Sequence, residues 1–370
     1  MSKQLQVSIP ALPASSYPIH IVQGWLTQPH RWLPPANCYE KYIIITDHCV
    51  KKHYGIALAK LLNSNGYPTT LFSFAGGEAA KTQTTKTQIE NKLLRAQHNR
   101  STLCLALGGG VVGDLAGFLT ATYMRGIDYI QLPTTLLAMV DSSVGGKTAI
   151  DTPYGKNLIG AFWQPKQVIA DISCLTTLSK KQRINGLIEA VKMFLTHDRS
   201  SLVYLDKNLD AAINGNLNVL AEIIYRAVKI KANVVAQDEK EANLRMVLNF
   251  GHTIGHALEI VADYKILHGT AVALGILVEA KIAELSGLLT ATDYNILAEL
   301  LTRLGMVKKM LRPFNADYII KATLHDKKTK ANQARYVLLT GLGSVYQKNN
   351  RYAHPISETL VKKAFLSLRQ

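Results

Sequence analysis

The chain has 370 residues, of which 48% are hydrophobic and 18% are charged. This balance is typical of a globular protein, and the length is comfortable for two hydrophobic cores. No apolar run reaches the ~18 residues that a membrane span needs, and the first residues, MSKQLQV, lack the features of a signal peptide. We therefore expect a globular protein with no membrane partner.

Basic residues outnumber acidic ones by 42 to 26, which gives a formal net charge of +16. An excess of this size is compatible with nucleic-acid binding. The lysines are nevertheless spread along the chain in short pairs, and the aromatic residues, at 7%, form no obvious stacking platform. We expect no nucleic-acid partner, because an anionic small-molecule ligand or a generally basic proteome explains the charge more simply.

The cysteines are widely scattered and contain no C-x-x-C motif. This pattern favours free thiols in a reducing cytoplasm over a disulfide framework. The residues concerned are Cys38, Cys49, Cys104 and Cys174.

The first half of the chain alternates short apolar runs with helix-like segments. The apolar runs predict strands at residues 42–47, 69–74, 103–107 and 129–133. The segments between them predict helices at residues 50–65, 82–99 and 115–123. Strands separated by helices indicate parallel β-α-β units and an open, twisted sheet, so we expect an α/β domain with a Rossmann-like parallel sheet at residues 1–180.

The pattern changes after about residue 180, where strand signals become rare. Helical spacing predicts helices at residues 184–195, 219–237, 247–261, 271–286 and 293–304, and one strand is predicted at residues 336–339. We therefore expect a second, mostly α-helical domain at residues 181–370.

A glycine-rich turn, GGGVVGD at residues 108–114, follows one predicted strand and opens a helix-like run. It fits the G-x-G-x-x-G pattern, in which bare glycines and a helix N-terminus receive a pyrophosphate. The acidic residue usually found about 20 positions later is not clear. The motif favours dinucleotide or phosphate binding, and a plain tight turn between strand and helix is the alternative.

A second polar block, DSSVGGKT at residues 141–148, is followed by GKN at residues 155–157. Its glycines are wrongly spaced for a P-loop, so a nucleotide hydrolase is disfavoured. The lysines, the asparagine and the acid suit an anionic, hydroxylated ligand.

The stretch NFGHTIGHALE places His252 and His256 on one face of a helix. Thr253 stands where a zinc protease needs its catalytic glutamate, which argues against proteolysis. A third imidazole follows at His268, and Glu189 lies in an apolar run where a divalent cation would offset its buried charge. Two histidines and one carboxylate form a typical catalytic zinc site, although separate core or surface histidines would give the same pattern.

These motifs occur in one order and spacing that resembles the 3-dehydroquinate synthase family of sugar phosphate cyclases, over residues 40–345. The blocks that carry the resemblance are GGGVVGDLAGF (108–118), YMRG (123–126), PTTLLA (133–138), DSSVGGKT (141–148), GKN (155–157), LR (244–245), NFGHTIGH (249–256) and DKK (326–328).

The resemblance implies an enzyme that converts 3-deoxy-D-arabino-heptulosonate 7-phosphate (DAHP) to 3-dehydroquinate and phosphate in the shikimate pathway. NAD would oxidise one substrate hydroxyl and later return the hydride, with phosphate elimination and an intramolecular aldol closure in the same cycle. One divalent metal, zinc or cobalt, would hold the substrate hydroxyls.

The resemblance also implies roles for individual residues. The implied metal ligands are Glu189, His252 and His268. The implied substrate-contacting residues are Lys147, Asn157, Lys192, Lys231, Arg245, Asn249, His256, Lys327 and Lys328, together with Arg125, which would reach a neighbouring subunit of a homodimer. The implied NAD-contacting residues are Asp47, Glu78, Lys81, Gly110, Val111, Val112, Gly113, Asp114, Thr134, Thr135, Asp141, Lys147, Lys156 and Thr177.

The chain departs from the family pattern at several positions. Thr270 stands where the family usually has Glu, Met193 and Phe194 replace Tyr-Gly, and Gln182 replaces a Glu. Two other hypotheses remain open. One is another sugar phosphate cyclase or a metal-dependent polyol dehydrogenase on the same fold. The other is a binding or nucleic-acid-associated protein that has lost catalysis.

Overall fold

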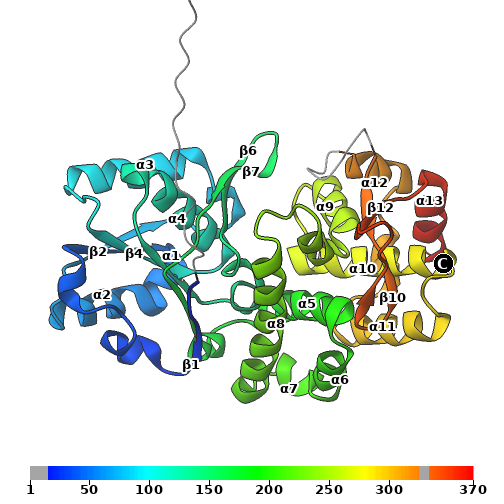
Figure 1. Ribbon diagram of the computed structural model, residues 1–370, viewed down its shortest axis with the longest axis horizontal. Helices are drawn as coiled ribbons and strands as arrows, with labels where there is room; N and C mark the ends of the chain where they lie inside the picture. Colours follow the sequence, from blue (N-terminus) through cyan, green and yellow to red (C-terminus); the bar gives the residue numbers. More distant parts are fainter. Residues whose placement is uncertain (1–15, 325–332, 370) are drawn as a thin grey trace, which may run out of the picture.

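The computed structural model describes residues 16–324 and 333–369. Figure 1 shows an α/β half and a mostly helical half side by side, with the long helix α8 (Leu217–Gln237) between them. The predicted fold class is therefore confirmed. Lys327 and Lys328, two of the predicted substrate-contacting residues, lie outside the described residues.

The α/β half is built on a six-stranded parallel sheet with the order β1-β8-β5-β4-β2-β3. Its strands are β1 (Ile19–Val22), β2 (Lys41–Asp47), β3 (Thr69–Phe74), β4 (Thr102–Gly108), β5 (Tyr129–Pro133) and β8 (Gln167–Asp171). All four predicted strands are confirmed. The strands β1 and β8 were missed, because β1 has only four residues and β8 follows a segment that carried no helix signal.

Alternation along β2 explains why both faces of this sheet are covered. Ile43 and Ile45 pack into a core with the helices α3 (Gln83–Arg95) and α4 (Gly110–Thr122). Tyr42 and Ile44 point to the opposite face, where they pack into a core with α2 (Ile56–Ser64). A strand that is buried on both faces reads as one continuous apolar run, as this one does.

A hairpin that the sequence analysis treated as a turn projects from the α/β half. It consists of β6 (Lys147–Thr152) and β7 (Gly155–Phe162), which pair antiparallel. Gly145 and Gly146, with φ angles of +96° and +66°, form a tight turn before Lys147. The hairpin therefore carries Lys147, Lys156 and Asn157 as a unit.

The second half packs its helices and short strands around one large core. Its helices are α5 (Lys180–His197), α6 (Arg199–Lys207), α7 (Leu209–Ile213), α8, α9 (His252–Val261), α10 (His268–Leu285), α11 (Ala291–Arg303), α12 (Ala316–Thr323) and α13 (Glu358–Ser367). Its strands are β9 (Arg335–Val337), β10 (Leu339–Gly341), β11 (Ser344–Val345) and β12 (Ala353–Pro355). Among the residues described, no helix is both long and apolar enough to cross a bilayer.

Two predicted elements of this half were wrong in their bounds. The single helix expected at residues 247–261 is divided into the 3-10 segment η9 (Leu244–Asn249) and α9. The division falls at Gly251, whose φ of +78° a helix cannot contain. The strand expected at residues 336–339 is likewise divided between β9 and β10.

Helices α9 and α10 approach each other closely at glycines. A Cβ atom on Gly275 would lie 1.9 Å from the carbonyl oxygen of Gly251 and 2.8 Å from the amide nitrogen of Gly255. Both neighbours are backbone atoms, so a side chain would have to push the helices apart. A Cβ atom on Gly255 would meet its nearest neighbour, Val272 Cα, at 3.1 Å, which a small shift can relieve.

We predict that Gly275→Ala lowers the free energy of unfolding by about 3 kcal/mol, because overpacking against backbone cannot relax locally. In Gly255→Ala the gain in helix propensity, about 1 kcal/mol, offsets the milder contact, so this matched control is expected to change stability little. Urea unfolding at 25 °C measures both variants. Equal stability of the two would show that the contact between α9 and α10 is less tight than described.

Candidate active site

The glycine turn lies at the carboxyl end of β4, where the sheet meets the N-terminus of α4. A Cβ atom on Gly108 would lie 2.5 Å from Val112, and one on Gly113 would lie 2.7 Å from Gln131 Oε1. The N-cap residue is Gly109, which has no side chain to occupy the helix end. Gly108 and Gly113 are thus required by close packing within the turn, and the bare N-cap leaves the positive end of the helix dipole available to an anion. The turn therefore fits a pyrophosphate.

A buried lysine organises the acids around this turn. Lys81, whose side chain is 3% exposed, lies 2.5 Å from Glu78, 3.3 Å from Asp114 and 3.5 Å from Asp151. Burial favours the neutral amine, but the three carboxylates outweigh it and raise the pKa of Lys81. Burial raises the pKa of Asp114 to about 6 despite the charge of Lys81. The structure thus brings together the three predicted cofactor residues Glu78, Lys81 and Asp114.

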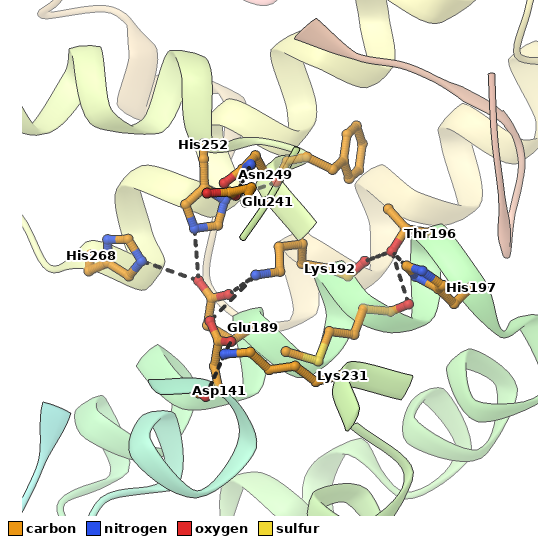
Figure 2. A network of polar contacts seen from close by, with 12 residues as sticks. Asp141, Glu189, Lys192, Thr196, His197, Lys231, Glu241, Asn249, His252 and His268 are labelled. Carbon is orange, nitrogen blue, oxygen red and sulfur yellow. Dashed lines mark hydrogen bonds and ion pairs between the residues drawn. The ribbon is translucent and has the colours of Figure 1, made fainter. Parts of the chain in front are cut away.

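The three predicted metal ligands converge although they lie on three different helices. Ligand atoms of Glu189 on α5, His252 on α9 and His268 on α10 all lie within 4.8 Å of one another. His268 Nε2 is 3.3 Å and His252 Nε2 is 3.7 Å from Glu189 Oε1. Figure 2 shows both rings directed at this carboxylate. Separate core or surface histidines, the alternative that the sequence left open, are excluded.

The chemistry of this cluster fits a divalent cation. Glu189 is fully buried, and among the described residues neither of its oxygens has a hydrogen bond of good geometry. Burial raises the pKa of Glu189, but the charge of Lys192 and the ring of His268 outweigh it and hold the pKa far below the usual range. Two imidazoles and an ionised carboxylate are a typical donor set for zinc or cobalt.

Glu259, which the sequence analysis did not select, orients His268. Its Oε2 atom lies 3.2 Å from His268 Nδ1, so the other ring nitrogen, Nε2, is directed at Glu189. A carboxylate behind a ligating histidine fixes the tautomer and strengthens the ligand. His256, Glu259 and His268 form a second, overlapping group of possible ligands. We prefer Glu189, because its Oε1 atom faces the Nε2 atoms of both His252 and His268, whereas Glu259 lies behind His268 at Nδ1. The signal was available, since Glu259 lies three residues after His256 on one helix face.

Buried lysines surround the far side of Glu189. Lys192 Nζ lies 2.5 Å from Glu189 Oε2, as expected for residues at i and i+3 on α5. The same Nζ atom lies 3.5 Å from Asp141 Oδ2. Lys231 donates to the backbone oxygen of Asp141 at 2.6 Å and also pairs with its carboxylate. Burial lowers the pKa of Lys231, while Asp141 opposes that shift. Asp141, predicted as a cofactor residue, therefore faces the lysines beside the metal ligands (Figure 2).

Glu241, also missed from the sequence, connects two predicted substrate residues. It pairs with Lys147 from the hairpin and accepts a hydrogen bond from Asn249 Nδ2 at 2.7 Å. Arg245, which is 2% exposed, donates to the carbonyl oxygen of Gly145 at 3.0 Å just before Lys147. Glu241 is one of three acids in the polar run DEKEAN, and no periodic signal distinguishes it from a solvated charge.

The remaining predicted residues have local contacts. Asp47 accepts from the amides of Cys49 and Val50 and so caps α1 (His48–Val50). Thr135 accepts from the amide of Ala138 at 3.3 Å, and Thr134 is buried at the end of β5. Val111 and Val112 lie in the first turn of α4, and the Thr177 hydroxyl lies 2.6 Å from the hydroxyl of Tyr54. The backbone amide of Asn157 donates to Asp151. Arg125 is exposed at the end of η6 (Tyr123–Arg125).

Comparison with known proteins decides the family. The model of the 3-dehydroquinate synthase N-terminal region matches residues 71–185, and that of the 3-dehydroquinate synthase C-terminal region matches residues 186–329. The chain belongs to the 3-dehydroquinate synthase family. It is 39% identical over 345 residues to the 3-dehydroquinate synthase of Rippkaea orientalis, covering 92% of this chain and 94% of that one. It is 40% identical over 334 residues to that of Aliivibrio fischeri, covering 90% and 92%.

Solved structures agree on the architecture. A 2-deoxy-scyllo-inosose synthase complexed with carbaglucose-6-phosphate, NAD⁺ and Co²⁺ superposes with a TM-score of 0.87 at 29% identity, over 94% of this chain and 95% of that one. A probable glycerol dehydrogenase from Sinorhizobium meliloti shares the fold with a TM-score of 0.66 at 12% identity, over 96% and 98%. The polyol dehydrogenases are thus related in fold, while the 39–40% identical curated relatives are all 3-dehydroquinate synthases.

We predict that His252→Ala and His268→Ala each lose a bound divalent cation, because each removes one of three protein ligands. His256→Ala is the matched control on the same helix face and is expected to keep the cation. Each variant is incubated with excess Zn²⁺ or Co²⁺ and then desalted, and elemental analysis measures the metal that the protein retains. Loss in His256→Ala with retention in His252→Ala would assign the cation to the group that contains Glu259.

Proposed function

We propose that the protein converts DAHP to 3-dehydroquinate and inorganic phosphate, with NAD and one divalent cation, zinc or cobalt, as cofactors. The observation that carries this proposal is the convergence of Glu189, His252 and His268 beside a set of buried lysines and an arginine. A metal-dependent polyol dehydrogenase would also need a metal site, but it would not need the cationic groups that suit a phosphate and a carboxylate. Membership of the family supports the same assignment.

Bound NAD would accept and return a hydride, and the bound cation would lower the pKa of the substrate hydroxyl that is oxidised. Glu189, His252 and His268 are the residues we assign to hold the cation. The glycine turn at residues 108–113 at the N-terminus of α4, with Lys81 and Asp114 beside it, would hold the dinucleotide. The hairpin that carries Lys147 and Lys156 would connect the two sites.

The chain's own residues would bind and orient the anionic groups of the substrate. Lys147, Arg245 and Asn249 lie around Glu241, so a substrate anion would replace existing carboxylate contacts instead of leaving charges unpaired. His256 lies one helical turn beyond His252, with ring centroids 5.3 Å apart, and its imidazole could exchange protons with a substrate oxygen. We further assign Lys192, Lys231 and Asn157 to substrate contacts, on the strength of their positions in the family motifs.

We predict that purified protein releases inorganic phosphate from DAHP only in the presence of NAD⁺ and a divalent cation. EDTA should abolish the release, and Zn²⁺ or Co²⁺ added in excess should restore it. A molybdate assay for phosphate, with 3-dehydroquinate followed by chromatography, measures both products. Protein that binds NAD⁺ and the cation yet releases no phosphate would contradict the proposal.

We also propose that the enzyme is a homodimer in which Arg125 reaches the substrate phosphate of the other subunit. Arg125 is exposed at the end of η6, where it can extend away from its own subunit. The hairpin strand β7 exposes Leu158 by 47% and Ile159 by 49%, and adjacent apolar side chains of this size favour burial against a second copy. The inferred cytoplasmic location rests on four free cysteines. The division into domains at residue 180 stays a prediction.

Mixed dimers test the shared site. Arg125→Ala and Lys147→Ala homodimers should both be nearly inactive, because each site lacks one anion-binding residue. Random mixing of the two after denaturation and refolding should restore about one quarter of wild-type activity, since half of the dimers would hold one intact site. Light scattering should give twice the 40.7 kDa of the chain. Mixtures that stay inactive while wild-type protein refolds would show that Arg125 does not act across subunits.

A further inference from the structure

We propose that the helices carrying the metal ligands are fixed by side chains that cap one another's N-termini, with Glu279 and Asn185 as the positioning residues. The inference rests on the proposed function, because it takes Glu189, His252 and His268 as the cation ligands. It adds two residues that act through the backbone of the helices that carry the ligands.

Helix α9 receives its cap from α10. Its N-cap residue is Gly251, which has no side chain to bind the first amides of the helix. Glu279 takes this place with both oxygens: Oε2 accepts from the Gly251 amide at 2.8 Å, and Oε1 accepts from the Ile254 amide at 3.2 Å. In an ordinary capping box, two side chains of the helix itself share these two amides. Here one carboxylate from another helix accepts from both amides, and His252 lies between the two capped residues in the sequence.

Helix α10 receives its cap from α5 in the same way. Its N-cap residue is Leu267, whose apolar side chain cannot accept a hydrogen bond. Asn185 Oδ1 accepts from the amide of Gly269 at 2.6 Å. A Cβ atom on Gly269 would lie 2.4 Å from the backbone oxygen of Asn185, so a glycine is needed for this approach. Asn185 lies one helical turn before Glu189, and Gly269 directly follows His268.

The two caps join the three ligand-bearing helices in series. Asn185 ties α5 to α10 beside Glu189 and His268, and Glu279 ties α10 to α9 beside His252. Each capped amide is within one turn of a ligand, so a shift of one helix would move the ligand by a similar distance. Metal ligands tolerate errors of only a few tenths of an ångström.

The burial of Glu279 supports a positioning role over a role in surface solubility. Its side chain is fully buried, and a buried carboxylate is unfavourable unless hydrogen bonds and nearby positive charge compensate it. The two amides and the positive end of the α9 dipole supply both. An apolar residue of equal size would fill the space but would leave Gly251 and Ile254 without this acceptor.

Cation affinity of the folded protein tests the inference. Glu279→Gln keeps the shape of the side chain but has only one acceptor oxygen. Its side-chain NH₂ group would face one of the two backbone N–H groups, and two donors cannot form a hydrogen bond. Asn185→Leu removes the second cap, whereas the conservative Asn185→Asp keeps an acceptor. We expect Zn²⁺ or Co²⁺ to bind 10- to 100-fold more weakly to Glu279→Gln and Asn185→Leu, and with near wild-type affinity to Asn185→Asp. Competition with a chelator measures the dissociation constant, with circular dichroism to show that each variant is folded.

Thr290→Ala is the matched control, because Thr290 caps α11 by accepting from the Asp293 amide at 3.1 Å, and α11 carries no ligand. It should lower the unfolding midpoint without changing cation affinity. If Glu279→Gln and Asn185→Leu behave like Thr290→Ala, the caps only stabilise the fold and the inference is overturned. His252→Ala distinguishes failure of the metal site from failure of the positioning role. If His252→Ala keeps the cation, the proposed metal site is wrong. If His252→Ala loses the cation while the cap variants keep it, only the positioning role is contradicted.

Discussion

The burial of one ionised carboxylate, Glu189, is the constraint on which the rest of the structure depends. A buried charge is tolerated only when opposite charge lies close to it. Lys192 supplies part of that charge from the same helix, and the histidines of α9 and α10 approach the remaining oxygen. The helices of the second half are therefore arranged so that the first residues of α9 and α10 meet the middle of α5 at this carboxylate.

The large positive charge of the chain is partly organised around this site. Lys147, Lys156 and Lys231 each pair with an acid, and the pairs connect the glycine-turn half with the helical half. In such pairs the carboxylate lies where an anion would bind, and it is the partner that a phosphate or carboxylate of the substrate can replace. A cationic site built in this way binds an anion by exchange of partners, which favours a small anionic ligand over the extended backbone of a nucleic acid.

The sequence was sufficient for the elements whose pattern is local. The β-branched run of β2 and the glycine turn after β4 were placed correctly because burial and turn geometry are written in neighbouring residues. The motif register also placed Glu189, His252 and His268 together, which spacing alone had left open. By contrast, Glu241, Asn185 and Glu279 were missed, since each acts on a partner that the fold, and not the local sequence, brings near. The hairpin of β6 and β7 was also missed, because the glycines and polar residues beside these strands are typical of a turn and mask the weak strand signal.

The departure at Thr270 has a physical explanation in the same packing. A glutamate there was expected to support the metal site, but His268 already receives its carboxylate partner from Glu259 on the neighbouring helix. Thr270 instead lines a largely apolar cavity of about 480 Å³, together with Ile184, Leu267 and Met306. With Asn185 serving as the cap of α10, the first turn of that helix does not need an acid of its own, so threonine is compatible with an intact site.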